Sequence, residues 1–482
     1  MTDATVSPAT TISPPAAALD DDTRQTRLRP ILWRLHFLGG FLAAPVAIWL
    51  ALTGILYAWN PQIEGWLFGD EMTAPATSAG DPRPLSDQLD AAVAEYPGTE
   101  LISVDPAVDP GSGDTTAVLL QPADAEAGAF GAAPGAFTAY VDPVSAELTG
   151  RVAEDRRPDE WLRNLHSNFR LGPASPGVGT LTELAASWVI VALLTGLYLW
   201  WPRSRRALAR ALLPRLQGLS RGGRRPWRNL HSTFGVLTFV VLASIVVTGL
   251  TWTEYAGRWV DVTKDAFAVE APFLNTELAG SSAGTGGGHA EHGDGGAGSA
   301  EAADFADVDR VAASAEDAGL TAPYTVTPAG EPGQAWTVDE IDNSWPLDQT
   351  QVALDPASRE VVDRLEFSDQ PLLDQATSLG IGFHEGSLFG LFNQILLTVL
   401  AIGVIVLLIA GYMTWWRRRP AGAFGAPPKM GSILRTVPIP LLIGFVLLLV
   451  LLPTLGVAFV AYLALERIVR LVRLRRRPAL AE

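Results

Sequence analysis

The sequence predicts a membrane all-α helical bundle with four main transmembrane helices and two small α+β domains outside the membrane. Spanning a bilayer core takes about 20 apolar residues per helix. Four stretches meet that length, at about residues 36–59, 181–201, 232–253 and 388–416. Tryptophans lie at or near their ends, which is typical of the membrane interface.

Charge separates the connecting segments. Residues 202–230 hold nine Arg and no acid, whereas residues 60–160 hold 19 acids and four Arg. Residues 254–387 hold 25 acids and five basic residues. Because basic loops stay in the cytoplasm, the N-terminus, 202–230 and 417–435 are expected inside, and both acidic segments outside. The nine-Arg loop is therefore interpreted as a topology signal and not as a nucleic-acid site.

The apolar region at 436–466 contains Pro438, Pro440 and Pro453, and a basic tail follows it from Arg467 to Arg477. A single kinked fifth helix would put this tail outside, against the charge rule. A hairpin or re-entrant pair broken near Pro453 keeps the tail inside, although each arm is short for a full crossing. The hairpin is the favoured interpretation.

Each acidic segment has the pattern of a small folded domain. Residues 85–96 and 304–318 are expected to form helices. Strand-like runs follow at 100–105, 115–121 and 136–142, and again at 323–327, 334–339 and 350–354. The third run ends alike in both segments, in Val141-Asp142-Pro143-Val144-Ser145 and in Leu354-Asp355-Pro356-Ala357-Ser358, and Arg151 and Arg364 follow six residues after each Ser. The two domains are therefore expected to be repeats.

The membrane helices repeat as well. Trp33-Arg34-Leu35-His36 opens the first helix, and Trp227-Arg228-Asn229-Leu230-His231 opens the third. Thr53-Gly54 and Thr248-Gly249 each place a Gly 18 residues after that histidine. The second and fourth helices end in Thr195-Gly196…Trp200-Trp201 and in Ala410-Gly411…Trp415-Trp416.

Four of the six histidines lie beside a membrane helix. The topology places His36 and His231 at the cytoplasmic side, and His166 and His384 at the outer side. Neutral imidazole is an axial haem ligand, so one pair per leaflet predicts two b-type haems that carry electrons across the bilayer. A lone histidine at a helix end is more often an interfacial or capping residue. Four histidines in two matched pairs within a repeat favour ligation.

The chain has no cysteine. Disulfides, thiolate metal sites, iron–sulfur clusters and covalently attached c-type haem are thereby excluded. No dinucleotide fingerprint for NAD(P)H or FAD is visible, so electrons would have to come from an unidentified cytoplasmic or membrane donor.

Other residues fit a haem site but have simpler explanations. Arg34, Arg163 and Arg228 precede a histidine by two or three positions and would pair with haem propionates; the alternative is snorkelling to the lipid headgroups. Six glycines would leave room for a flat macrocycle or would allow close helix packing: Gly39, Gly40, Gly54, Gly196, Gly249 and Gly411.

The segment 279–300 is a Gly-rich and His-rich insert, which is interpreted as flexible. Within it, His289 and His292 would bind a transition metal together with Glu291 or Asp294. The alternative is a polar linker without a metal.

Together these features predict an order of segments along the chain. It comprises a disordered cytoplasmic tail without a signal peptide (1–27), transmembrane helix 1 (28–60), outer domain 1 (61–160), a His-bearing segment with transmembrane helix 2 (161–202), a basic loop (203–226), transmembrane helix 3 (227–254), outer domain 2 (255–380), transmembrane helix 4 (381–417), a cytoplasmic loop (418–435), the apolar hairpin or fifth helix (436–466) and a basic tail (467–482).

The sequence resembles the PepSY-associated transmembrane family, also described as iron-regulated membrane proteins. The matching motifs are Arg34-Leu35-His36-Phe37-Leu38-Gly39-Gly40, Leu165-His166-Ser167, Leu194-Thr195-Gly196-Leu197-Tyr198-Leu199-Trp200-Trp201-Pro202, Leu230-His231-Ser232-Thr233-Phe234-Gly235 and Phe383-His384-Glu385-Gly386-Ser387-Leu388-Phe389-Gly390. The resemblance covers about residues 28–430 and implies that the outer domains are PepSY modules.

Similar members include inner-membrane ferric-siderophore reductases with two b-type haems. The resemblance therefore implies haem-iron ligation by His36, His166, His231 and His384, with reduction of a ferric siderophore or other ferric iron at the outer face of a bacterial cytoplasmic membrane. The acidic outer face favours a cationic substrate.

Two other functions stay open at this point. A non-redox PepSY membrane protein would bind a peptide or protein partner for protease regulation or sensing, with structural histidines. An iron or siderophore permease component would move the chelate intact, although the four main helices lack the broken midplane pairs typical of transporters.

Overall fold

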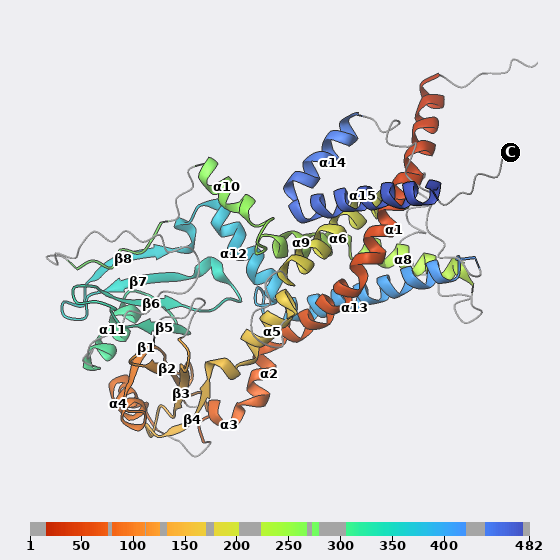
Figure 1. Cartoon of the computed structure of the whole chain (residues 1–482). Coiled ribbons are helices and arrows are strands. Elements are labelled where there is room, and N and C mark those ends of the chain that lie inside the picture. The colour runs from red at the N-terminus through yellow and green to blue at the C-terminus, as the bar shows by residue number, and fades with distance from the viewer. Residues whose placement is uncertain are drawn as a thin grey trace, which may run out of the picture. The chain divides into compact units, whose positions relative to one another are not determined.

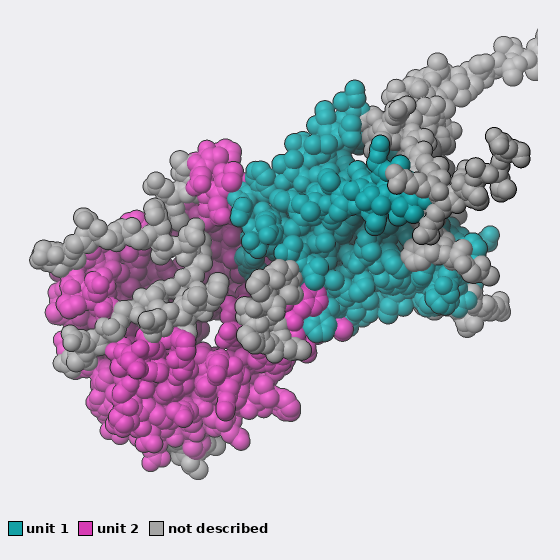
Figure 2. Space-filling view, viewed as in Figure 1, with its two compact units in different colours: residues 1–49, 179–259, 402–482 teal, residues 50–178, 260–401 magenta. Residues whose placement is uncertain are grey.

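The computed structural model describes residues 16–75, 80–110, 112–125, 133–169, 178–201, 223–267, 272–278, 305–420 and 439–475 (Figure 1). Most of the basic loop 203–226 and of the loop 418–435, the insert 279–300 with His289 and His292, and residues 476–482 lie outside that description. The chain divides into two compact units, which Figure 2 colours separately. Unit 1 comprises residues 1–49, 179–259 and 402–482, and unit 2 comprises residues 50–178 and 260–401.

Three of the described helices are long and apolar enough to cross a membrane. They are Leu28–Ala58 within α1 (Ala16–Ala58), Gly179–Trp200 within α6 (Val178–Trp200), and α13 (Leu391–Trp416). These helices correspond to the first, second and fourth apolar stretches of the sequence. Helix α1 begins at Ala16, so it extends into the segment that was expected to be a disordered tail.

The third apolar stretch is a bent pair of helices instead of the expected continuous helix. Helices α8 (Arg224–Leu237) and α9 (Phe239–Leu250) meet at an angle of 62°. The bend lies at Thr238, whose hydroxyl donates to the carbonyl of Phe234 at 2.8 Å. Such a bond from a Thr side chain to the preceding turn is a known cause of helix bending. Gly403 of α13 has no side chain at this point, and a Cβ there would lie 3.1 Å from the Thr238 methyl group.

The C-terminal apolar region is also a bent pair. Helices α14 (Ile439–Leu451) and α15 (Pro453–Arg475) turn by 116°, at the proline where the sequence analysis placed the break. The buried carboxylate of Glu183 in α6 accepts hydrogen bonds from the Thr454 hydroxyl at 3.1 Å and from the Tyr255 N–H at 3.0 Å. Farther along α15, Glu466 forms an ion pair of 3.2 Å with Arg34. Polar contacts therefore hold α15 near its first residue and again in its second half.

Unit 2 contains one antiparallel sheet of eight strands in the order β4-β3-β2-β1-β5-β6-β7-β8 (Figure 1). The strands are β1 (Thr99–Asp105), β2 (Thr116–Pro122), β3 (Phe137–Val141), β4 (Leu148–Ala153), β5 (Tyr324–Thr327), β6 (Trp336–Glu340), β7 (Thr350–Leu354) and β8 (Val361–Glu366). The two segments that were expected to form separate domains share this sheet, because β1 pairs with β5 at Val104 and Val326.

Helices α4 (Leu85–Glu95) and α11 (Ala306–Asp317) contribute to a single core with the sheet. Leu89 of α4, Val308 of α11 and Val104 of β1 are fully buried in it. Burial of one aliphatic side chain of this size contributes about 1.5–3 kcal/mol. The core is therefore common to both halves of the sheet.

The remaining elements of this part of the chain are short. They are α2 (Asn60–Leu67), α3 (Gly69–Met72), α5 (Pro158–Asn168), α10 (Arg258–Ala266), α12 (Leu372–Glu385) and the 3-10 turns η1 (Glu154–Arg156), η2 (Pro346–Asp348) and η3 (Phe367–Asp369).

The repeated Asp-Pro motifs form matching turns, between β3 and β4 and between β7 and β8. Asp142 accepts the N–H of Val144 at 2.9 Å, and Asp355 accepts the N–H of Ala357 at 2.9 Å. In each turn one residue has a left-handed backbone, namely Ala146 (φ 58°) or Arg359 (φ 63°). The similarity in sequence thus reflects a shared turn conformation.

The two arginines that follow these turns occupy equivalent places. The guanidinium of Arg151 stacks 5.0 Å above the ring of Tyr96, the residue that ends α4. Arg364 donates to the carbonyl of Ala318, the residue that ends α11, at 2.7 Å. A cation at the C-terminal end of a helix is favourable because the last carbonyls carry partial negative charge. In each repeat, the arginine on the strand after the turn therefore contacts the C-terminal end of the helix.

Strands β4 and β8 were not expected from the sequence. They are the two edge strands, and each pairs with a single neighbour. Their residues Leu148–Ala153 and Val361–Glu366 lack a clear apolar alternation, because only part of an edge strand faces the core.

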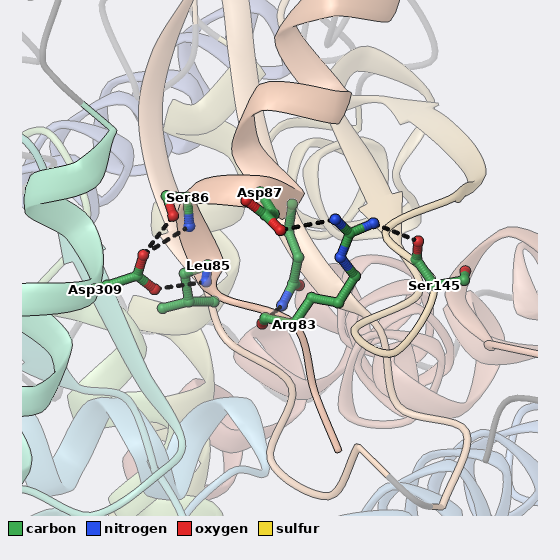
Figure 3. Close-up of polar contacts among 7 residues, drawn as sticks. Arg83, Leu85, Ser86, Asp87, Ser145 and Asp309 are labelled. Atoms are coloured by element: carbon green, nitrogen blue, oxygen red, sulfur yellow. Dashed lines mark hydrogen bonds and ion pairs between the residues drawn. The ribbon is translucent and has the colours of Figure 1, made fainter. Parts of the chain in front are cut away.

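The carboxylate of Asp309 links helix α11 to helix α4 (Figure 3). Asp309 of α11 accepts the backbone N–H of Leu85 at 2.6 Å and that of Ser86 at 3.3 Å, and it also accepts the Ser86 hydroxyl. The N–H groups in the first turn of a helix have no acceptor within that helix, and Asp309 supplies the acceptor for these two. Arg83, just before this turn, binds Asp87 at 2.8 Å and the carbonyl of Ser145 at 3.3 Å.

Replacement of Asp309 by Ala removes the cap of α4. A lost helix cap typically costs about 1 kcal/mol, so hydrogen exchange at the first amides of α4 in the full-length protein should accelerate by roughly fivefold or more. The matched control is Asp307→Ala, which removes a carboxylate of the same helix that pairs with Arg310. Equal exchange of α4 in both variants would contradict the assignment.

Candidate functional site: two histidine pairs

In unit 1 the structure brings His36 of α1 and His231 of α8 together. Their ring centroids lie 5.8 Å apart, and the ring planes cross at 73°. The Nδ1 atom of His36 lies 2.9 Å from the carbonyl oxygen of Ala192, and the Nδ1 atom of His231 lies 2.9 Å from that of Leu407. A carbonyl oxygen only accepts hydrogen bonds, so both Nδ1 atoms carry the proton and donate it. Each Nε2 atom therefore keeps a free lone pair.

In unit 2 the structure brings His166 of α5 and His384 of α12 together. Their ring centroids lie 6.3 Å apart, with planes crossing at 78°. The Nδ1 atom of His166 lies 2.9 Å from the hydroxyl oxygen of Thr53. This hydroxyl also lies 3.3 Å from the carbonyl of Leu50, to which it donates. When the hydroxyl hydrogen takes that bond, the hydroxyl oxygen accepts from Nδ1 of His166, and Nε2 of His166 then keeps the lone pair.

Glycines make room for three of these imidazole rings. A Cβ on Gly196 would lie 2.9 Å from Cε1 of His36, one on Gly411 would lie 3.1 Å from Nδ1 of His231, and one on Gly54 would lie 3.3 Å from Cε1 of His166. Gly54, Gly196 and Gly411 therefore face histidines, where a side chain would displace the ring.

Two further glycines from the sequence analysis have other surroundings. A Cβ on Gly39 would lie 3.1 Å from Trp188, which is a close helix contact, and one on Gly40 would meet nothing within 4 Å. Close helix packing therefore explains Gly39. Neither glycine indicates where a macrocycle would bind.

The electrostatics of the unit 2 pair favour neutral imidazoles. Burial and the neighbouring His384 lower the pKa of His166 to about 4. Burial raises the pKa of Glu385, the residue after His384, while a hydrogen bond from Tyr57 and the charge of Arg163 oppose this rise. At neutral pH His166 is uncharged, which is the form that ligates a metal.

The spacing of each pair would suit one metal ion held between two imidazole nitrogens. Two metal–nitrogen bonds of about 2.0 Å, extended to the ring centres, would place the imidazole centroids about 6 Å apart. The observed separations are 5.8 and 6.3 Å. Among the described residues, no group of three or more His, Cys, Asp or Glu side chains is placed to hold a metal ion.

The three arginines of the sequence analysis have different surroundings. Arg34 contacts Tyr462 and Glu466 of α15. Arg163, on α5 with His166, is exposed and acts electrostatically on Glu385. Arg228 of α8 is exposed. For Arg34, pairing with a haem propionate would compete with the ion pair to Glu466.

The sequence analysis missed the acceptors of the Nδ1 protons. Two of them are backbone carbonyls, which no residue type reveals. The third, Thr53, had a signal in the repeated Thr-Gly pair, but the pattern alone assigned that pair no role.

Comparison with known proteins supports the architecture. The model of a family described as PepSY-associated TM region matches residues 33–418. A search of the curated proteins found no match. The matched range contains all four histidines of the two pairs.

Substitution of Gly196 by Ala should destabilise the protein relative to Gly40→Ala. Both changes add the same methyl group to a membrane helix, where Ala is the better helix former. Only at Gly196 does the methyl group meet a ring that is held by a hydrogen bond, and overpacking of this kind costs about 1–3 kcal/mol. Thermal unfolding in one detergent measures the difference, and equal midpoints for both variants would show that the His36 ring is not confined.

Proposed function

The chain belongs to the family of PepSY-associated TM regions, and on this basis we propose that it binds two b-type haems and transfers electrons across a membrane to ferric iron. The observation that carries the proposal is the pair of two-histidine sites with axial spacing. Haem, when bound, supplies a one-electron ferric/ferrous couple at each site. The substrate is ferric iron, free or in a siderophore.

In this proposal each part of the chain has a defined task. His36 and His231 hold the haem of unit 1, and His166 and His384 hold that of unit 2. The Nδ1 contacts of His36, His166 and His231 would fix these rings and leave Nε2 available to a bound metal. The glycines against the rings keep the imidazoles free of side-chain contacts that would turn them.

The charge distribution gives the proposed direction. The acidic segments are expected on the outer face of a bacterial cytoplasmic membrane, and the basic loops on the cytoplasmic face. A cationic ferric chelate would be attracted to the acidic face. Electrons would enter from a cytoplasmic or membrane donor and leave to the chelate outside.

The first test is the absorption spectrum of the protein purified from haem-replete cells. A Soret band and a b-type pyridine haemochrome with two haems per chain are expected. His36→Ala or His166→Ala should lower the haem content by about half, because each removes one axial ligand of one site. The double variant His289→Ala/His292→Ala is the control and should keep both haems. A colourless wild-type protein would rule out the proposal.

The second test concerns orientation and uses the natural absence of cysteine. A single cysteine in place of the exposed Asp342, in the acidic part of unit 2, should react with a membrane-impermeant maleimide on spheroplasts. A single cysteine in place of Ser204, in the basic loop, should react only after the membrane is permeabilised. The reverse pattern would place the acidic domains inside and exclude reduction of external iron.

A further inference from the structure

The two histidine pairs differ in the groups that accept their Nδ1 protons. In unit 1 both acceptors are backbone carbonyl oxygens, each at 2.9 Å. In unit 2 the acceptor for His166 is the hydroxyl oxygen of Thr53, also at 2.9 Å. Carbonyl oxygens of peptide groups are stronger acceptors than alcohol oxygens because the amide group carries a larger dipole.

The acceptor of the Nδ1 proton influences the ligating nitrogen. A strong acceptor draws the proton away from the ring and makes Nε2 a better electron donor, and such partners tune a metal's potential. A better donor stabilises ferric over ferrous iron and so lowers the midpoint potential. A weaker acceptor has the opposite effect.

We propose that Thr53 is a positioning residue, which fixes the His166 ring and, as the acceptor of its Nδ1 proton, tunes the midpoint potential of the unit 2 haem. The proposal rests on the proposed function, since it concerns one of the same two sites.

The local structure supports a dedicated role for Thr53. Its side chain is buried, with 3% exposure, and its hydroxyl hydrogen is directed to the carbonyl of Leu50. Gly54, the next residue, lies against the same histidine ring at a virtual Cβ distance of 3.3 Å. The Thr-Gly pair thus supplies both the space for His166 and the acceptor for its proton.

The chain contains a matched comparison at Thr195-Gly196. There Gly196 lies against His36 in the same way, but the hydroxyl of Thr195 donates to the carbonyl of Val191 at 2.6 Å and lies 3.4 Å from Nδ1 of His36. His36 instead uses the Ala192 carbonyl. The same residue pair therefore provides the proton acceptor in unit 2 and not in unit 1.

The test is a spectroelectrochemical titration of the full-length protein with its haems. His36→Ala keeps only the unit 2 haem and His166→Ala keeps only the unit 1 haem, so the two midpoint potentials can be assigned. Thr53→Val should raise the midpoint potential of the unit 2 haem because it removes the acceptor, and Thr53→Ser should restore it.

Thr195→Val is the control and should leave the potential of the unit 1 haem unchanged. No shift in Thr53→Val, or an equal shift of the unit 1 haem in Thr195→Val, would each overturn the proposal while the haem function stands.

A second readout does not require haem. In the haem-free protein, nitrogen NMR of His166 should show the tautomer with the proton on Nδ1 in the wild type and in Thr53→Ser, and a mixture of tautomers in Thr53→Val. An unchanged tautomer in Thr53→Val would overturn the positioning role. A change in tautomer in a protein that binds no haem would support that role and reject the haem function.

Discussion

The close approach of two imidazole rings in each unit is the interaction on which the proposed chemistry depends. Two histidines with centroids 5.8 or 6.3 Å apart cannot both be charged in a buried site without a large electrostatic cost. Their arrangement therefore favours neutral rings. The carbonyls of Ala192 and Leu407 face Nδ1 of His36 and His231, and the hydroxyl of Thr53 faces Nδ1 of His166.

Glycine makes this approach possible. In a membrane, small residues at helix interfaces usually allow two backbones to pack, as Gly39 does against Trp188. Gly54, Gly196 and Gly411 instead face imidazole rings, so the space gained by the missing side chain is occupied by a histidine. In the proposed function this confinement would hold the rings in fixed orientations.

The duplication of the chain has two structural consequences. In the sheet, the repeated helix and strands combine into one eight-stranded sheet through the pairing of β1 with β5. In the histidine sites, each pair takes one residue from the first repeat, at residues 28–202, and one from the second repeat, at residues 227–417. Neither repeat alone contains both residues of a pair.

The sequence by itself determined the apolar segments, the charge of the loops, the repeated Asp-Pro turns and the four candidate histidines. These features depend on residue type and local spacing, and composition reveals them directly. The expected helix at 232–253 is bent at Thr238, and the edge strands β4 and β8 escaped notice, because long-range packing and pairing decide both.

Only the tertiary structure decided which atoms receive the Nδ1 protons of three of these histidines. Backbone carbonyls carry no sequence signature, and Thr53 and Thr195 are the same residue in the same motif. The two threonines differ because the turn of α6 before Thr195 offers His36 the carbonyl of Ala192, whereas His166 meets the hydroxyl of Thr53. The repeat thus placed the histidines at equivalent positions in the sequence, and the local packing decided which oxygen atom lies next to Nδ1 of each ring.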